Sequence, residues 1–416
     1  MGWFLAIRQI QRANKGTTAL IVSIMVLTFL NLVVVSGLLV GLLAGSFQQF
    51  REGYSGEVII TAEDGRDYIE NSQALISYLN NHPKVVAISP RYAKTVQVLG
   101  TLTDLPAKNE RPNQIGLRLT GIDPAKEEVL TRFSRFLMAG ENLDTNQEGY
   151  ALIGSNMIKK YSNFADANIP GLSLLDDVDV GSRVRISFSS GEEIIKKDFI
   201  IKGVVKSKVD EISTRMFILD RELKRLIPVN KEQVQEIAVK SDYKYAPILV
   251  AEIKSFMGNN AARIQTSDEA IPSFLRDVET TFRILGNALS SIALVVASIT
   301  IFIVIFINAV TKRKFIGIMK GIGISPLAIQ ISYVLQAIFY GVFGSAVGLL
   351  LTFGLLKPYF NKHPIDFPFS DGILVATWAG SLTRVGILLL VTLIAGYLPA
   401  KLIIRKNTLD SILGRN

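Results

Sequence analysis

The sequence predicts an α-helical membrane protein with four transmembrane helices and a large mixed α/β extracytoplasmic domain inserted between helices 1 and 2. The chain has 416 residues, of which 49% are hydrophobic, which is too apolar for an ordinary soluble enzyme. Runs without any charged residue cover 16–50, 284–311 and 321–356, and about 20 apolar residues are enough to cross a bilayer. A long polar segment separates the first two runs.

The positive charge of the chain is concentrated beside the apolar runs. Residues 46–280 hold 30 Lys and Arg against 33 Asp and Glu, whereas the remainder of the chain holds 15 against 3. Cations beside membrane spans mark the cytoplasmic side, so this excess orients the spans and does not indicate a nucleic-acid partner. The chain has no cysteine, which excludes disulfides, thiolate metal sites and thiol nucleophiles.

Residues 1–17 are expected to form an amphipathic helix on the cytoplasmic surface of the membrane, because Arg8, Arg12 and Lys15 share one helical face. Residues 18–45 follow as transmembrane helix 1. A cleaved signal peptide is the alternative, but its apolar core would be about half as long as this run. We therefore favour an uncleaved first span.

Transmembrane helix 1 carries a strip of small residues. Gly37, Gly41 and Gly45 repeat the G-x-x-x-G spacing, which lets another helix approach closely. The partner helix belongs either to the same bundle or to a second subunit, and the sequence leaves this choice open.

Residues 46–280 have the mixed helix and strand pattern of the extracytoplasmic domain. A short helix is predicted at 72–81, where Leu75 and Leu79 recur at helical spacing. Strand patterns occupy 57–61, 96–99, 114–121 and 179–218. We expect a split α/β lobe near the membrane and a strand-rich lobe inserted at about residues 115–200.

Transmembrane helix 2 is placed at residues 281–310 and is expected to begin outside the lipid as a stalk. Its approach carries a coiled-coil-like seam at i, i+3, i+7 and i+10. The seam residues are Leu275, Val278, Phe282 and Leu285.

Residues 311–326 form a short basic segment between two spans, and this segment is the centre of the functional hypothesis. Four cations, Lys312, Arg313, Lys314 and Lys320, fall within nine residues. Apolar residues recur at helical spacing, namely Phe315, Ile318, Met319 and Ile322. Either the cations only fix topology while the apolar face lies in the lipid headgroups, or the helix is the part through which a soluble ATPase moves the membrane domain. We favour the second interpretation.

The C-terminal third contains the last two spans. Transmembrane helix 3 is placed at 327–356, an aromatic and proline-rich outer loop at 357–376, transmembrane helix 4 at 377–400, and a cytoplasmic tail at 401–416. Helix 3 has a second strip of small residues, which includes Gly341, Gly344 and Gly348. Arg384 interrupts helix 4, and it either reaches the outer surface or faces a protein interior; we favour the outer surface. Both termini are expected in the cytoplasm.

Chemistry for catalysis is missing from the sequence. There is no Gly-Lys dipeptide, so no G-x-x-x-x-G-K-[ST] phosphate loop exists. His82 and His363 are the only histidines and are interpreted as surface turn residues, and the Asp176, Asp177 and Asp179 cluster as a solvated turn without calcium-loop spacing. We therefore expect no catalytic residues, no metal and no cofactor. The spans also lack carboxylates, which argues against ion-coupled transport, so the energy must come from another protein.

Several strings resemble the permease subunits of MacB/FtsX-type ABC transporters, which include the lipoprotein-releasing LolC/LolE-type permeases. The order of one span, a large extracytoplasmic domain and three further spans matches that family over the entire chain. The similar strings are Ser89-Pro90-Arg91, Gly121-Ile122-Asp123-Pro124, Ala151-Leu152-Ile153-Gly154-Ser155, Val180-Gly181-Ser182-Arg183-Val184, Ile201-Lys202-Gly203-Val204, Ile316-Gly317-Ile318-Met319-Lys320-Gly321-Ile322-Gly323 and Gly396-Tyr397-Leu398-Pro399-Ala400. The tail at 407–413 resembles the family's ending only loosely.

The resemblance implies a dimer of permease subunits, identical or different, that binds two copies of a cytoplasmic ABC ATPase and relays its motion along stalk helices to the outer domain. It implies that the ATPase is contacted through Lys312, Arg313, Lys314, Phe315, Ile318, Met319, Lys320, Gly321 and Gly323. Relatives usually carry glutamates where this chain has Lys312, Lys314 and Phe315. Other implied partners are the lipid membrane and a periplasmic adaptor or lipoprotein.

Three classes of function follow, and we rank them in this order. The first is a transporter permease of the cytoplasmic membrane that releases or exports lipidated or amphipathic substrates, such as lipoproteins, small amphiphiles or peptides. The second is an FtsX-like transmembrane signalling subunit that activates a cell-wall hydrolase. The third is a membrane-anchored enzyme with its active site in the insert. No nucleophile, metal site or acid–base constellation in the sequence supports this class.

Overall fold

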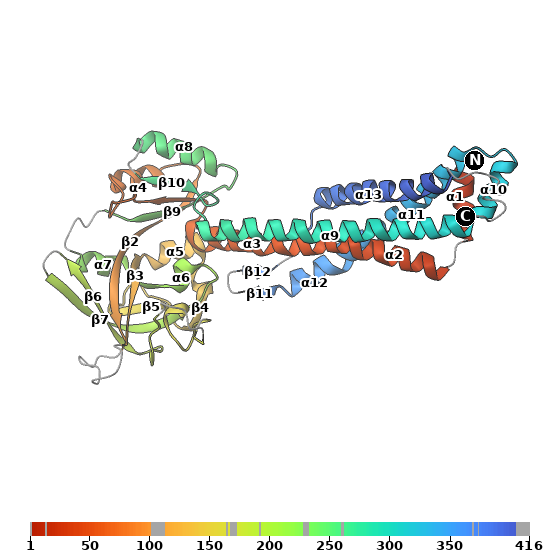
Figure 1. The fold of residues 1–416 in the computed structure, drawn as a ribbon. Helices are drawn as coiled ribbons and strands as arrows, with labels where there is room; N and C mark the ends of the chain where they lie inside the picture. Colours follow the sequence, from red (N-terminus) through yellow and green to blue (C-terminus); the bar gives the residue numbers. More distant parts are fainter. Residues whose placement is uncertain are drawn as a thin grey trace. The chain divides into compact units, whose positions relative to one another are not determined.

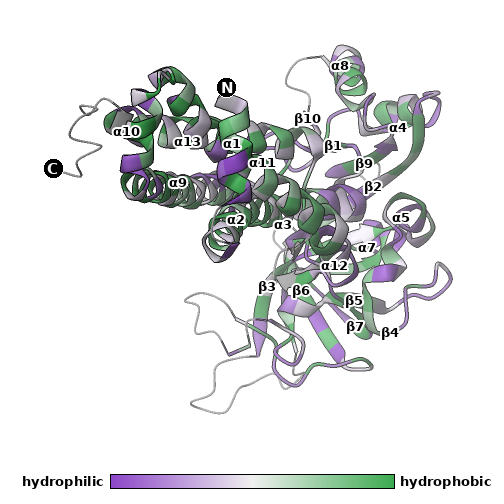
Figure 2. Cartoon of the chain, turned by 90° about the vertical axis from the view of Figure 1, so that its right-hand side faces the viewer, coloured by the Kyte–Doolittle hydropathy of each residue, from purple (hydrophilic) through white to green (hydrophobic). Residues whose placement is uncertain are grey.

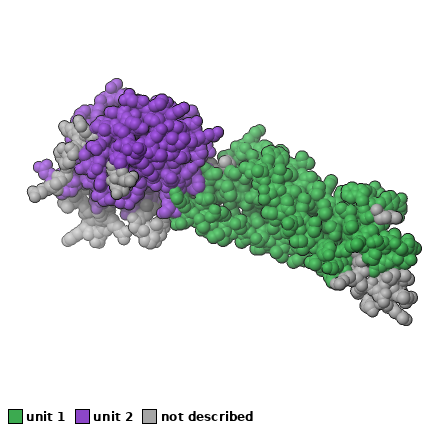
Figure 3. Space-filling view, turned by 90° about the horizontal axis from the view of Figure 1, so that it is seen from above, with its two compact units in different colours: residues 1–44, 274–367, 371–416 green, residues 45–273, 368–370 purple. Residues whose placement is uncertain are grey.

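The computed structural model describes residues 2–12, 15–100, 113–163, 165–166, 173–190, 193–227, 233–258, 262–367, 370–372 and 374–404. The chain divides into two compact units (Figure 3). The helical unit comprises residues 1–44, 274–367 and 371–416, and the insert unit comprises residues 45–273 and 368–370. Each unit is described by itself.

The helical unit contains long apolar helices preceded and joined by short ones (Figure 1). Helix α1 (Gly2–Gln11) comes first. Among the described residues, four helices are long and apolar enough to cross a membrane: Lys15–Ser55, Ser273–Thr311, Pro326–Lys362 and Trp378–Leu402. Their parts are α2 (Lys15–Leu30), the π-turn Asn31–Val35, α3 (Ser36–Phe50) and the π-turn Arg51–Ser55; α9 (Ser273–Thr311); α10 (Arg313–Gly321); α11 (Pro326–Leu351), the π-turn Thr352–Leu356 and α12 (Lys357–Lys362); and α13 (Trp378–Ile404). Figure 2 shows these helices coloured mostly as hydrophobic.

The third long helix continues beyond the predicted span. The outer loop expected at 357–376 instead opens with α12, Lys357–Lys362, and only then reaches the short strands β11 (Ile365–Phe367) and β12 (Ser370–Gly372). Pro358 was interpreted as a loop residue, but it lies in the first turn of α12, where proline's missing N–H needs no helical acceptor. The π-turn before it absorbs the change in hydrogen-bond pattern.

Helix α11 is the centre of the helical unit. Its buried side chains include Ile329, Tyr333, Ala337 and Tyr340, and they form one apolar core with residues of the other helices. Members of that core on α2 are Ile21, Met25 and Phe29. By contrast, α9 leaves most of its apolar side chains outside this core, among them Ile292, Val295, Ile299, Ile303 and Ile307.

The insert unit is built on one ten-stranded sheet. Nine of its strands lie in the order β10-β1-β9-β2-β3-β8-β5-β7-β4, and β6 pairs with both β2 and β7. The strands are β1 (Val58–Thr61), β2 (Val85–Leu99), β3 (Gln114–Ile122), β4 (Leu137–Gly140), β5 (Tyr150–Gly154), β6 (Arg183–Ser190), β7 (Glu193–Val205), β8 (Arg215–Leu219), β9 (Glu236–Ser241) and β10 (Arg263–Thr266). The helices are α4 (Ser72–Asn80), α5 (Pro124–Thr131), α6 (Asp210–Ser213), α7 (Asp220–Leu226) and α8 (Ala246–Met257), with 3-10 turns at Phe133–Phe136 and Ser155–Met157.

Strand β2 is shared by two lobes (Figure 1). Its first half pairs with β9, which continues to β1 and β10, and its second half pairs with β3 and β6. The strand-rich lobe therefore extends past the end expected near residue 200. Strand β8 pairs in parallel with β3 from Arg118–Arg215 to Ile122–Leu219, and this pairing across the sequence is invisible to local periodicity.

Glycines in two of the family-like strings lie where no side chain fits. A Cβ on Gly154 would lie 2.2 Å from the carbonyl oxygen of Ser213, and one on Gly203 would lie 2.7 Å from that of Glu141. Backbone segments approach each other closely at both places. Gly154 and Gly203 thus mark positions of close backbone packing in the insert unit.

Candidate functional site

Helix α10, Arg313–Gly321, is the predicted basic amphipathic helix. Its buried residues are Ile316 and Gly317, and Ile316 joins the apolar core of the helical unit. The apolar residues singled out from the sequence mostly face outward: Phe315 is 68% exposed, Ile318 50% and Ile322 72%. Met319 alone among them packs against the core. The helix is therefore anchored on one side and presents an uncovered apolar face on the other.

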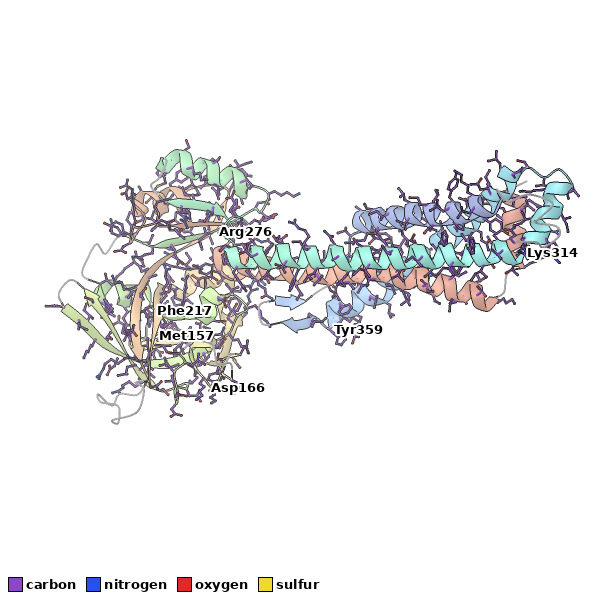
Figure 4. The ribbon with its side chains drawn as sticks, in the orientation of Figure 1. Met157, Asp166, Phe217, Arg276, Lys314 and Tyr359 are labelled. Atoms are coloured by element: carbon purple, nitrogen blue, oxygen red, sulfur yellow. The ribbon has the colours of Figure 1, made fainter. Side chains whose placement is uncertain are left out.

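The four cations of this segment differ in exposure. Lys314 is exposed (Figure 4), and Lys312, Arg313 and Lys320 are half-buried. No carboxylate in the described part of the chain forms a salt bridge with Lys314. The outer surface of α10 thus combines large apolar side chains with positive charge.

The two glycines assigned to ATPase coupling have different local roles. Gly323 has φ +90°, and the bonds from Gly323 N to Lys320 O (3.0 Å) and from Ile324 N to Met319 O (2.9 Å) close α10 with a Schellman motif. Gly321 is exposed, and a Cβ there would have no atom within 4 Å. Gly323 therefore shapes the turn into α11, whereas Gly321 is an open surface position.

The predicted small-residue strips meet partners within this chain. A Cβ on Gly344 would lie 2.4 Å from Met25 Cβ, and one on Gly348 would lie 2.4 Å from the Phe29 ring. Gly341 faces Leu389 of α13 instead. These glycines allow α11 to pack directly on α2 and α13.

Gly37 meets an extended segment and not a helix. A Cβ on Gly37 would lie 2.8 Å from the carbonyl oxygen of Val375, whose amide donates to Gly37 O at 3.1 Å. Gly41 and Gly45 are also buried. Gly37, the first glycine of the strip, therefore lets the extended segment before α13 pack directly on the first long helix.

The stalk residues Leu275, Val278 and Phe282 lie on α9, in one continuous helix with the second apolar run. The last seam residue, Leu285, is 50% exposed, and its neighbour Gly286 is buried instead. A Cβ on Gly286 would lie 3.3 Å from Leu39 Cδ1 of α3. Close packing of α9 on the first span therefore occurs at Gly286, and the stalk role of the seam residues stays a prediction.

Arg384 contacts the first long helix. Its Nη2 donates a hydrogen bond to Ser36 Oγ of α3 at 3.0 Å, and the side chain is half-buried. The hydroxyl of the first residue of α3 therefore gives this arginine a protein acceptor, and its position relative to the outer surface of the membrane stays a prediction.

A buried ionic cluster in the insert unit was not predicted. Tyr54 lies near the end of the helix Lys15–Ser55. Its hydroxyl donates to Glu236 Oε2 at 2.6 Å and accepts from Arg215 Nη2 at 2.9 Å. Its backbone carbonyl accepts from Arg91 Nη2 at 2.8 Å, and the guanidinium groups of Arg91 and Arg215 lie over its ring, 4.7 and 5.0 Å from the centroid.

Carboxylates balance the two buried arginines. Arg91 forms a two-pronged salt bridge with Glu127, with Nη2–Oε1 at 2.5 Å and Nε–Oε2 at 3.1 Å. Arg215 Nη1 lies 3.1 Å from Glu236 Oε1, and the more exposed Arg118 lies 3.0 Å from the same atom. The cluster therefore joins the end of the first long helix to β2, β3, β8, β9 and α5.

Charge compensation keeps Glu236 ionised despite its burial. Burial would by itself raise the pKa of this carboxyl, but the neighbouring Arg215, Arg118 and Arg91 charges lower the pKa to about 2. No local sequence signal could have found this group, because Tyr54 and Glu236 are 182 residues apart.

The candidate metal and acid–base residues have ordinary partners. Within the described ranges no group of three or more His, Asp and Glu side chains could hold a metal ion. Asp176 pairs with Lys159 at 2.9 Å, and Asp179 pairs with Lys160 and accepts from Tyr161. The hydrogen bonds from Lys160 and Tyr161 lower the pKa of Asp179 to about 2. His82 Nε2 lies 3.2 Å from Glu252.

Comparison with known proteins identifies the family. Residues 287–408 match the family model described as FtsX-like permease C-terminal. The lipoprotein-releasing system transmembrane protein LolC of Neisseria meningitidis serogroup B is 21% identical over 343 residues, which cover 78% of this chain and 76% of that protein. The chain is an ABC transporter permease of the MacB/FtsX/LolC type.

Other similar proteins match a smaller share of this permease. An uncharacterized ABC transporter permease of Methanocaldococcus jannaschii is 23% identical over 53% of this chain and 56% of its own length. The periplasmic region of MacB from Actinobacillus actinomycetemcomitans has 15% identity and a TM-score of 0.35, with 56% of this chain and 97% of that one covered. The extracellular domain of the YknZ transporter from Gram-positive bacteria has 12% identity and a TM-score of 0.32, with 50% and 98% covered. These TM-scores are too low to establish a common fold.

Membership of this family agrees with the absence of a phosphate-loop motif, because permease subunits are not catalytic themselves. The matched region, 287–408, contains the whole of α10, α11 and α13. The buried ionic cluster around Tyr54 lies outside it.

Proposed function

We propose that this permease converts ATP hydrolysis by a separate, dimeric ABC ATPase in the cytoplasm into movement of its extracytoplasmic domain, residues 46–280. The movement releases or exports lipidated or amphipathic substrates. A second permease subunit, identical to this one or different, completes the complex. The name of the Neisseria relative, a protein of a lipoprotein-releasing system, supports a lipidated substrate.

The exposed apolar face of α10 is the observation that carries the proposal. Phe315, Ile318 and Ile322 recur on one side of a short helix, and no other described element covers them. Burial of such a face in a partner's groove is a common mode of helix recognition. Ile316 holds α10 on the core of the bundle, so a push on the helix is passed to α11 and its neighbours.

The positions of the basic helices support the orientation. A Cβ on Gly2 would lie 3.1 Å from the carbonyl oxygen of Ala328, so α1 packs on the first turns of α11, directly after α10. Arg8 and Lys312–Lys320 are therefore at one end of the helical unit, and α12 follows the opposite end of α11 (Figure 1). Cations favour the cytoplasmic side, so we place α1 and α10 there.

The first long helix is the proposed path to the outer domain. It runs from Lys15 to Ser55 without a break in helical hydrogen bonding. Its last turn holds Tyr54, which is fixed by Arg91, Arg215 and Glu236. A displacement of this helix is thereby transmitted to both lobes through β2, β8 and β9.

Replacement of Gly321 tests the docking of the ATPase. We expect Gly321→Leu to lower the ATP hydrolysis rate of the complex in liposomes by about tenfold or more, which corresponds to about 1.4 kcal/mol of lost docking energy. The permease itself should remain folded, because a side chain there meets no atom within 4 Å. The measurements are the amount of co-purified ATPase and its hydrolysis rate.

Gly386→Leu is the matched control, because Gly386 is also an exposed helical glycine with no atom near its Cβ position. Gly323 is unsuitable, since any side chain at φ +90° strains the turn itself. Equal coupling in Gly321→Leu and wild type would contradict docking at α10. Mass spectrometry of the purified complex then separates a bound lipidated molecule from a bound cell-wall hydrolase, which an FtsX-like signalling subunit would carry.

A further inference from the structure

The insert unit contains a cavity of about 690 Å³ beside the middle of β2. This volume is within the range of ligand sites, about 300–1,000 Å³. Its walls come from the segment after β1, the start of β9, the end of β6 and helix α7. The residues used below are Glu63, Tyr92, Lys94, Thr95, Phe188 and Gln233.

The cavity lies where one edge of β2 has no partner strand. Pairing of β2 with β9 ends at Arg91–Glu236, and pairing with β6 begins at Gln97–Ser187. Between these points β2 is paired only on its other side, with β3, among the described residues. The sheet therefore has a window in this edge, from Tyr92 to Val96.

The backbone of Thr95 points into this window. Gln235 N donates to Arg91 O at 3.2 Å, and Ala93 N donates to the side-chain Oε1 of Gln235 at 2.8 Å. In a strand, the N–H and C=O groups of alternate residues point to the same edge. The N–H and C=O of Thr95 therefore point to the same edge of β2 as those of Arg91 and Ala93, which is the unpaired edge. The side chain of Gln235 already takes the place of one strand partner.

The walls offer contacts for both the backbone and the side chains of a ligand. Gln233 Oε1 is buried and accepts no hydrogen bond from the described part of the chain. Tyr92 and Phe188 contribute aromatic residues to the lining, and Lys94 and Glu63 contribute one charge of each sign.

We propose that this cavity binds an extended peptide segment of a partner polypeptide, which adds a short strand to the open edge of β2 at Thr95, next to the Gln235 side chain that already accepts from Ala93 N. An added strand supplies backbone donors and acceptors at a spacing that matches Thr95. A peptide also carries both a donor for Gln233 and charges for Lys94 and Glu63. The inference concerns the insert unit alone and does not depend on ATPase coupling.

Disulfide capture of peptides tests the proposal, because the chain has no cysteine of its own. The blocked pentapeptide acetyl-Thr-Cys-Thr-Val-Thr-amide is supplied as its mixed disulfide with 2-mercaptoethanol and equilibrated with full-length Thr95→Cys permease in detergent, in a buffer that contains 2-mercaptoethanol. The thiolate introduced by Thr95→Cys attacks the peptide sulfur and releases 2-mercaptoethanol, so capture proceeds by thiol–disulfide exchange without an added oxidant. We expect at least tenfold more captured peptide than for Gln97→Cys. Gln97 is the matched control because it is exposed on the same face two residues away, where β6 already covers the edge.

A second peptide separates backbone recognition from other binding. The same pentapeptide with N-methyl groups on alternate residues keeps its side chains but loses the donors on one edge. We expect its capture by Thr95→Cys to fall to the level of Gln97→Cys. Equal capture of both peptides, or equal capture by both variants, would refute strand addition at β2. The cavity would then be interpreted as a site for small amphiphiles.

Discussion

Charged residues are buried around Tyr54, at the end of the first long helix, in a cluster that was not predicted from the sequence. Arg91 and Glu127 each expose only 3% of their side chains, and Glu236 likewise exposes 3%. Removing ions from water is costly, and such clusters contribute less to stability than to the choice of one arrangement. Here they fix Tyr54 in one position between two lobes, which suits a part that transmits force.

Loss of one carboxylate should be strongly destabilising. Glu236→Gln leaves Arg215 without its main counter-charge, and we expect the free energy of unfolding of the insert to fall by about 3–5 kcal/mol. The measurement is the urea unfolding midpoint of the full-length protein in detergent. Glu70→Gln is the control, because its pair with Arg66 is exposed and should contribute about 0.5 kcal/mol or less.

The contribution of Glu236 should also depend on pH. Its pKa in the folded state, about 2, is below the ordinary 4.5. Its stabilisation is therefore complete above the unfolded-state pKa and is lost as the pH falls from 4.5 toward 2. The difference in unfolding midpoint between wild type and Glu236→Gln should shrink over that interval. A difference that stays constant from pH 7 to 2.5 would show that Glu236 is not held ionised.

At the scale of elements, α11 is the helix on which the helical unit depends. Gly344 and Gly348 let α2 pack directly against it, and Gly341 does the same for α13. Interfaces of small residues give close van der Waals packing, which is the main attraction between helices in lipid.

A single methyl group should disturb this interface. Gly344→Ala places a Cβ 2.4 Å from Met25 Cβ, and overpacking of this kind costs about 1–3 kcal/mol. We expect a lower thermal unfolding midpoint in detergent, measured by tryptophan fluorescence. Gly354→Ala is the matched control, because the same helix has open space there. An unchanged midpoint for Gly344→Ala would mean that α2 does not pack on α11 in this register.

At the scale of the whole molecule, the central expectation is that α10 and the insert lie on opposite sides of the membrane. This follows from the positive charges at α1 and α10 and from an odd number of spans between the first basic helix and the insert.

Labelling from one side of the membrane tests this topology. In the cysteine-free chain, Ile322→Cys and Asp64→Cys introduce single thiols at exposed positions. A membrane-impermeant maleimide added to whole cells after permeabilisation of any outer membrane should label Asp64→Cys and leave Ile322→Cys unlabelled until the inner membrane is opened. Labelling of both from the outside would refute the proposed direction of force transmission.

The sequence by itself determined the features that depend on neighbours in the chain. The four apolar spans, the helix at 313–321 and the alternation of Ile115, Leu117 and Leu119 follow from local periodicity, because lipid and core select side chains at fixed spacing. The predicted cytoplasmic tail at 401–416 lies mostly outside the described residues.

Only the tertiary structure decided which side chains meet across the chain. Nothing near Arg384 indicated Ser36, and nothing near Tyr54 indicated Arg215 or Glu236, since these partners are 161 to 348 residues apart. The window in β2 likewise arises from where two other strands stop. Hydrogen bonds and ion pairs act over about 3 Å in space, and a one-dimensional pattern carries no record of that distance.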